Sequence, residues 1–185
     1  MDALQELLAR DGIRQLAERY ALAVDGKDLD GLATLFVDDV DDVDNGRYGT
    51  GAEGVKRFYD RSLRNFHCSM HLVDNHVIDF DDDDRAQGIV YCRAHHHVLE
   101  PEHWFDVALA YFDTYERVGG EWRFRRRRVR SWYRQEFGSP DRGTERVAAT
   151  AATSGPQRGA CMPDAFPTFA EFWARPPHEQ PDGLT

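Results

Sequence analysis

The chain has 185 residues, of which 41% are hydrophobic, 12% aromatic and 30% charged, and its formal net charge is −10. This length predicts one domain that can bury a core and a pocket, and the aromatic content argues against a disordered chain. The excess of 33 acidic over 23 basic residues disfavours nucleic acids as partners. No apolar run approaches the roughly 20 residues that a membrane helix needs, so no membrane association is expected.

The N-terminal sequence and the cysteines indicate a cytoplasmic protein. The segment MDALQELLARDG is acidic and helical in pattern, unlike a signal peptide. The three cysteines, Cys68, Cys92 and Cys161, lack the spacing of a disulfide framework or a zinc site.

Helical patterns occupy the first third of the chain. Apolar residues at helical spacing predict a helix over residues 2–24 that ends at Gly26. Asp28 is expected to cap a short second helix, and a third is expected over residues 51–66. The acidic run between them, residues 38–44, is expected to form a turn.

The pattern then changes to the period of strands. Four strands are predicted, over residues 69–80, 86–100, 104–117 and 121–137. Gly119-Gly120 between the last two is a strong hairpin signal. Helices followed by a run of strands predict an α+β fold, with the helices packed on one face of a mostly antiparallel sheet.

The composition changes again near residue 138. We expect an α+β domain over residues 1–137 and a Pro- and Gly-rich tail over residues 138–185. Within the tail, PTFAEFWA at residues 167–174 predicts a short amphipathic helix that docks on the domain or on a neighbouring subunit.

Asp25 is the first candidate for chemistry. It ends an apolar helical segment, where a buried carboxylate requires a partner. Tyr20 lies five positions earlier and can border the same cavity. The alternative is that Asp25 only ends the helix beside Gly26, and its spacing alone favours that simpler role.

His71 lies in the first predicted strand. Alternation places it on one face with Val73 and Val77, while His76 and Ile78 share the other face. The pattern does not decide which face is buried. An isolated histidine in a strand is more often structural than catalytic.

The triplet His95-His96-His97 suggests either a metal site or a pocket residue. His96 shares a strand face with small apolar residues, Val90, Cys92, Ala94 and Val98, which is typical of a pocket wall with one polar group. His95 and His97 share the opposite face, which we expect in solvent. A zinc site would need further ligands, so we favour His96 as a functional residue and expect no metal.

The arginine run RFRRRRVR, residues 123–130, suggests nucleic-acid binding on first inspection. The aromatic residues around it instead predict a sheet strand whose arginines pair with acidic neighbours. We expect Arg128 or Arg130 to reach the cavity.

Three segments, IRQLAERYALAVDGKDLDGLATLF, SMHLVDNHVIDFDDDDRAQGIVYCRAHHH and YFDTYERVGGEWRFRRRRVRSWY, carry a resemblance to a known family. Their order and spacing resemble a SnoaL-like domain of the nuclear transport factor 2-like superfamily. The resemblance implies a curved sheet wrapped by helices into a cone with a deep pocket. It is strongest to scytalone dehydratase, bile-acid 7α-dehydratase and lindane dehydrochlorinase, which are cofactor-free lyases with an Asp–His pair.

The resemblance implies roles for particular residues. Asp25 and His71 match the Asp–His pair, Tyr20 matches a tyrosine of the bile-acid enzyme, and His96 matches a second histidine of scytalone dehydratase. Ala94 replaces an aspartate of the bile-acid enzyme. The expected substrate-binding residues are Tyr48, Phe58, Cys92, Ala94, Arg128 and Arg130.

The resulting hypothesis is a dehydratase-type lyase without a cofactor. Its substrate is expected to be small, hydrophobic and cyclic, of polyketide or steroid type, and the chain is expected to form a homodimer or homotrimer. Two alternatives stay open: an isomerase or cyclase in the same pocket, and a non-catalytic small-molecule binding protein.

Overall fold

The computed structural model describes residues 1–40, 47–137, 163 and 165–179. The helices are α1 (Ala3–Asp25), α2 (Leu29–Thr34), α3 (Gly51–Leu63) and α4 (Pro167–Ala174). The strands are β1 (Cys68–Phe80), β2 (Arg85–Leu99), β3 (Glu102–Val118) and β4 (Glu121–Phe137). The predicted α+β class is confirmed.

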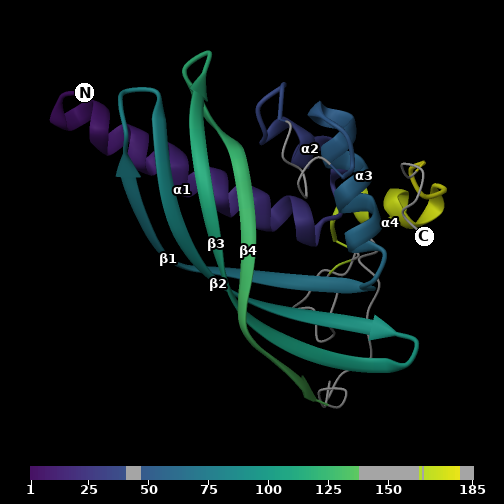
Figure 1. Cartoon of the computed structure of the whole chain (residues 1–185). Coiled ribbons are helices and arrows are strands. Elements are labelled where there is room, and N and C mark those ends of the chain that lie inside the picture. Colours follow the sequence, from purple (N-terminus) through teal and green to yellow (C-terminus); the bar gives the residue numbers. More distant parts are fainter. Residues whose placement is uncertain (41–46, 138–162, 164, 180–185) are drawn as a thin grey trace, which may run out of the picture.

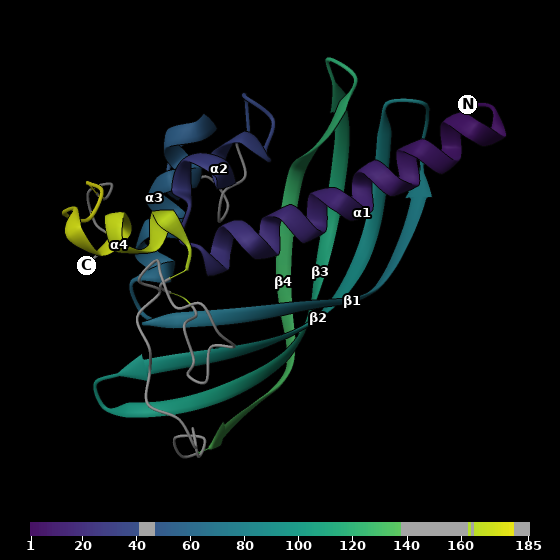
Figure 2. The same ribbon diagram turned by 180° about the vertical axis from the view of Figure 1, so that it is seen from behind.

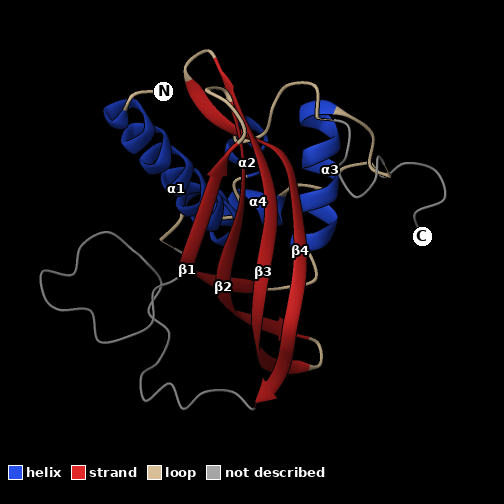
Figure 3. Ribbon diagram, turned by 60° about the vertical axis from the view of Figure 1, so that its left-hand side comes forward, coloured by secondary structure: helices blue, strands red, loops and turns tan. Residues whose placement is uncertain are grey.

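The strands form one antiparallel sheet in the order β1-β2-β3-β4, as Figure 3 shows. At the β3–β4 hairpin, Gly119 and Gly120 have φ angles of 62° and 89°, which side chains other than glycine adopt at a cost. The strands curve strongly, so the sheet has a concave face (Figure 1).

Helix α1 lies across this concave face, and α2, α3 and α4 gather near its C-terminal end (Figure 2). Its first turn is closed by a capping box between Asp2 and Gln5, and the helix continues through Gly12 without a break. Asp28 caps α2 by accepting a hydrogen bond from the backbone of Gly31, as the sequence predicts.

The hydrophobic core fills the space between α1 and the concave face. Ile13 from α1, Leu32 from α2, Val55 from α3 and Phe124 from β4 are all fully buried in it. Because residues from α1, α2, α3 and β4 meet here, the helices and the sheet share a single hydrophobic core.

A register shift in β1 corrects the predicted strand faces. The pairing with β2 shifts between Val73 and His76, so the faces exchange beyond this point. Val77 is therefore 61% exposed, and Ile78 is 3% exposed on the inner face. His76 lies on the same inner face as His71, where alternation had separated them.

The helix predicted at residues 167–174 is α4, and its Phe169 and Phe172 are buried against the rest of the chain. The domain boundary near residue 138 stays a prediction, because residues 138–162 lie outside the described part. The acidic run at residues 38–44 is described only in part. No helix in the described ranges is long and apolar enough to cross a membrane.

The fully buried Phe124 provides a test of the core. Phe124→Ala should lower the free energy of unfolding by about 3–5 kcal/mol, because it leaves a cavity between α1 and the sheet. Leu22→Ala is the control, since this leucine is 61% exposed on α1; its effect should stay within about 0.5 kcal/mol. Urea unfolding measures both, and equal effects would contradict the assigned core.

Candidate functional site

The Asp25 carboxylate connects the end of α1 to β1. Its Oδ1 accepts a hydrogen bond from the Ser69 hydroxyl at 2.8 Å and lies 2.7 Å from Nδ1 of His71. Its Oδ2 accepts from the backbone N–H of His71 at 2.8 Å. The structure therefore brings together the two residues expected to form an Asp–His pair, and gives the buried carboxylate several donors.

His71 borders a cavity of about 200 Å³ between α1, α3 and the sheet. Tyr20 and His96, the other two predicted catalytic residues, border it as well. The lining is completed by Val24, Phe58, Tyr59, Ser62, Leu63, Phe66, Ser69, Tyr111, Arg127 and Val129. The lining thus contains two imidazoles, and much of the remaining wall is aromatic.

Three tyrosines contribute phenol groups to the cavity. Tyr59 donates a hydrogen bond to the Tyr20 hydroxyl at 3.3 Å, and the Tyr20 ring meets the Tyr111 ring edge to face. Burial raises the pKa of all three hydroxyls, most strongly for Tyr59 and Tyr111. They are therefore neutral at ordinary pH and can donate hydrogen bonds.

Arg127 supplies the positive charge at the cavity wall, which corrects the expectation for Arg128 or Arg130. The β3–β4 pairing shifts between Thr114 and Tyr115, so Arg125 is an extra residue and Arg127 turns inward. Arg128 and Arg130 are exposed and do not line the cavity.

The Arg127 guanidinium is held by charge and by rings. It donates to both carboxylate oxygens of Asp113 on β3, at 3.0 and 2.7 Å, and both side chains are buried. It also lies about 4 Å from the ring centroids of Tyr20, Tyr111 and Phe124. Burial opposes the charge, but Asp113 more than offsets it and raises the pKa of Arg127.

His96 is a neutral imidazole in this site. Its ring stacks on Phe105 at 4.7 Å between centroids and meets the His71 ring at 5.6 Å. Its Nδ1 atom is buried and has no hydrogen-bond partner among the described residues. Burial, and secondarily the nearby His71, lowers the pKa of His96 to about 3.

The remaining predicted residues divide between the cavity and the core. Phe58 lines the cavity. Tyr48, Cys92 and Ala94 are buried but do not line it. Burial raises the pKa of Cys92 to about 12, so it is a neutral thiol.

The other two histidines of the triplet have separate environments. His95 contacts Asp106 across the β2–β3 pair. His97 is buried and stacks on Trp104 at 4.4 Å, which corrects the expectation that it faces solvent. In the described ranges no group of three His, Cys, Asp or Glu residues is placed to hold a metal ion.

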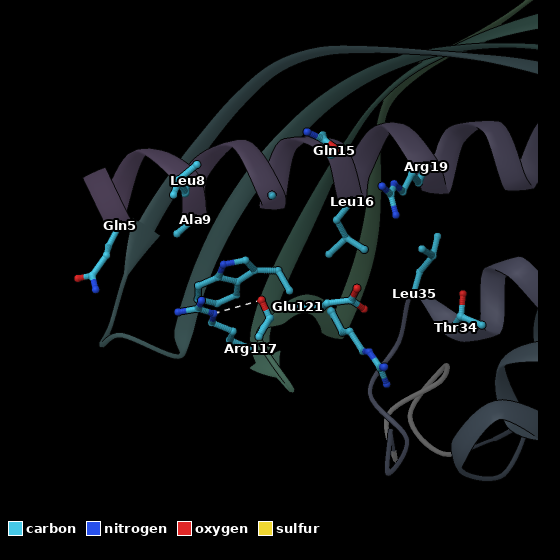
Figure 4. Close-up of a pocket in the computed structure, with 14 residues that line it drawn as sticks. Gln5, Leu8, Ala9, Gln15, Leu16, Arg19, Thr34, Leu35, Arg117 and Glu121 are labelled. Atoms are coloured by element: carbon cyan, nitrogen blue, oxygen red, sulfur yellow. Dashed lines mark hydrogen bonds between the residues drawn. The ribbon is translucent and has the colours of Figure 1, made fainter. Parts of the chain in front are cut away.

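A larger cavity of about 440 Å³ lies at the other end of α1, against the β3–β4 turn (Figure 4). Leu8, Leu16 and Gln15 from α1 border it, opposite Arg117 and Glu121. No histidine lines this larger cavity. The smaller cavity, which His71 borders, is therefore the better candidate for catalysis.

Sequence reasoning missed Arg127, Tyr111 and Tyr59 as site residues. Helical spacing does place Tyr59 on the inner face of α3, but nothing in that spacing distinguishes a pocket phenol from a core ring. Arg127 was missed because a bulge is invisible to simple alternation.

Breaking the buried ion pair should be costly. Arg127→Met leaves the Asp113 carboxylate buried without its cation, and should lower the free energy of unfolding by about 3–5 kcal/mol. Arg123→Met is the matched control, because Arg123 pairs with the exposed Asp38; its cost should be at most about 1 kcal/mol. Similar losses in urea unfolding would contradict the assigned role of Arg127.

The buried histidines predict acid sensitivity. Burial lowers the pKa of His76 to about 4 and that of His96 to about 3, whereas both lie near 6.5 in an unfolded chain. Between about pH 6.5 and 4 the unfolded state binds more protons, so the free energy of unfolding should fall as the pH falls. His96→Gln should reduce this slope and the half-buried control His103→Gln should not; equal slopes in urea unfolding would refute the assignment.

A model of the SnoaL-like domain family matches residues 5–128. Among solved structures, the hexachlorocyclohexane dehydrochlorinase LinA type 2 matches at 23% identity and a TM-score of 0.64, covering 75% of this chain and 98% of that one. Another LinA structure matches at 26% identity and a TM-score of 0.66, covering 74% and 95%. A Novosphingobium aromaticivorans protein, provisionally assigned as a scytalone dehydratase, matches at 24% and 0.62, covering 73% and 91%.

No curated protein matches the chain. The family model nevertheless covers well over half of it, from the first turns of α1 into β4, and this range includes both Asp25 and His71. The structural neighbours share the helix-wrapped curved sheet. The chain belongs to the SnoaL-like domain family, within the nuclear transport factor 2-like superfamily.

Proposed function

We propose that this protein is a cofactor-free lyase that eliminates water or another small leaving group from a cyclic substrate. The observation that carries the proposal is the Asp25–His71 contact of 2.7 Å at the wall of an otherwise largely aromatic cavity. The dehydrochlorinase and dehydratase names of the structural neighbours agree with this class of reaction.

His71 is the proposed base. When the Nδ1–H group donates a hydrogen bond to Asp25, Nε2 carries no proton. The lone pair of Nε2 is then available to the substrate. Asp25 also stabilises the imidazolium that forms when Nε2 removes a proton from carbon. The C–H electron pair becomes the new C=C bond, and the leaving group departs with the electrons of its own bond.

Neutral phenols and Arg127 are the proposed stabilisers of developing negative charge. Tyr20 lines the cavity with its ring against the Arg127 guanidinium and keeps its proton, so it can donate to an oxygen that becomes negative. The His71 imidazolium returns its proton to a departing hydroxyl. His96 is neutral, so it can serve as a hydrogen-bond partner but not as a charged acid.

The size and walls of the cavity narrow the substrate class. About 200 Å³ lies below the ≈300–1,000 Å³ typical of ligand pockets. We therefore favour a one- or two-ring compound over a steroid. Phe58, Leu63 and Phe66 would contact the ring, while an oxygen or halogen substituent would lie toward the phenols.

An isomerase is the second candidate, and the same geometry supports it. One imidazole next to several neutral donors can return the proton to a different carbon instead of expelling a group. The mass of the product separates the two reactions, because isomerisation conserves mass.

Self-association is a further proposal. Large apolar side chains, including Phe112, Trp132 and Tyr133, are exposed on β3 and β4. Such patches commonly mark interfaces. We propose a homodimer or homotrimer through this sheet face.

The catalytic proposal is tested with hexachlorocyclohexane and scytalone as probe substrates. Asp25→Asn and His71→Gln should each reduce turnover by about 10²–10⁴-fold, because each removes one half of the acid–base pair. Chloride release and the loss of water in the product mass are the measurements.

His95→Gln is the matched control, since His95 also contacts a carboxylate but lies outside the cavity lining. It should keep wild-type turnover. Near-normal rates in both Asp25→Asn and His71→Gln would reject the lyase mechanism.

A further inference from the structure

Lys27 is the most unusual buried residue outside the proposed catalytic pair. It lies two positions after Asp25 and is only 2% exposed. Its backbone φ is 54°, in the left-handed region that is strained for a residue with a side chain. A buried ammonium and a strained backbone both persist only where the surroundings compensate for them.

The Lys27 ammonium contacts the C-terminal end of α3 and the turn that follows it. It donates to the backbone oxygen of Leu63 at 2.9 Å and to that of Phe66 at 2.9 Å. Carbonyls at a helix C-terminus lack helical partners and attract cations. Leu63 and Phe66 both line the cavity, and the Phe66 ring lies 4.6 Å from His96. The ammonium therefore fixes one wall of the site.

Helix α4 closes over the same ammonium. The Lys27 nitrogen lies 4.9 Å from the ring centroid of Phe172, 5.0 Å from that of Trp173 and 5.9 Å from that of Phe169. Such aromatic surroundings stabilise a cation that water does not reach. Burial lowers the pKa of Lys27 to about 8, which still leaves it protonated at neutral pH.

Further contacts hold α4 in this place. The Thr168 hydroxyl donates to the backbone oxygen of Gly26 at 2.6 Å, and a Cβ at Gly26 would lie 3.0 Å from the Phe166 ring. The fully buried Asp60 accepts hydrogen bonds from Arg64 and from the backbone of His178, just beyond the helix. The turn that follows Asp25 is thus covered by the C-terminal segment.

We propose that Lys27 is a positioning residue for the Asp25–His71 pair and for the Leu63–Phe66 wall, and that α4 is the clamp that keeps it in place. This inference rests on the proposed function for its catalytic meaning. In this arrangement the C-terminal segment is part of the site architecture, because its aromatic rings hold the cation that fixes both the end of α1 and the end of α3.

The test uses the full chain labelled uniformly with ¹⁵N, and it follows the Nδ1 proton of His71 by NMR. Trp173→Ala should make this proton exchange with water about tenfold faster, the scale expected when one buried cation–π contact is lost. Lys27→Met, which also loses two hydrogen bonds, should accelerate the exchange at least as much. The backbone amide of the fully buried Val90 reports global opening and should exchange at a rate no different from wild type.

Lys56→Met is the matched control, because Lys56 is the other lysine of the chain and pairs with the exposed Asp30 at 2.6 Å. It should leave the His71 signal unchanged. If Lys27→Met does not fold, Trp173→Ala decides, since it leaves the buried Phe172 in place. Wild-type exchange of the His71 proton in the folded variants would overturn the proposal.

This readout needs no substrate, so it separates the two proposals. If the Lys27 and Trp173 variants exchange the His71 proton at the wild-type rate, while turnover still requires Asp25 and His71, only the role of Lys27 is rejected. If these variants exchange the His71 proton faster but the wild-type protein turns over no probe substrate, the clamp is supported and the lyase function is not.

Discussion

The geometry of the site depends on one carboxylate that is taken out of water. Asp25 stands at the last position of α1, and its hydrogen-bond donors, the Ser69 hydroxyl and the backbone and ring nitrogens of His71, all belong to β1. A buried carboxylate is tolerated only where such donors replace water. The axial position of α1 on the sheet is therefore fixed at this end, and with it the position of Tyr20, more than one turn earlier.

Charge is distributed unevenly around the cavity. The carboxylate of Asp25 lies behind the imidazole at one end, and Arg127 with its own partner Asp113 lies at another part of the wall. Three phenols and His96 also line the cavity and are kept neutral by burial. A proton taken up by His71 therefore has few competing bases nearby, and negative charge that develops on a substrate meets donors that are already in place.

Much of the fold could be predicted from the sequence, because each pattern persists over a long segment. Strands of 13 to 17 residues show their period clearly, and Asp28 and Gly119-Gly120 mark ends and turns through local chemistry. Asp25 and His71 were found through resemblance, since alternation alone left His71 undecided. The partner of the aromatic helix α4 could not be found, because nothing local shows that Lys27 lies 5 Å from Trp173, a residue almost 150 positions away.

The failures of prediction and the shape of the site have a common physical origin. The sheet is bent most easily where an extra residue interrupts the pairing, and β1 and β4, the two edge strands, both carry such shifts. Each shift exchanges the faces of the strand beyond it, which turns His76 and Arg127 inward and leaves Val77 and Arg128 outside. A regular β4 that kept Phe124 opposite Tyr115 would instead place Arg126 opposite Asp113 and turn Arg127 outward. The irregularity that lets the sheet curve around α1 therefore also selects which arginine is buried, so the curvature of the cavity and the identity of its cation depend on the same inserted residue.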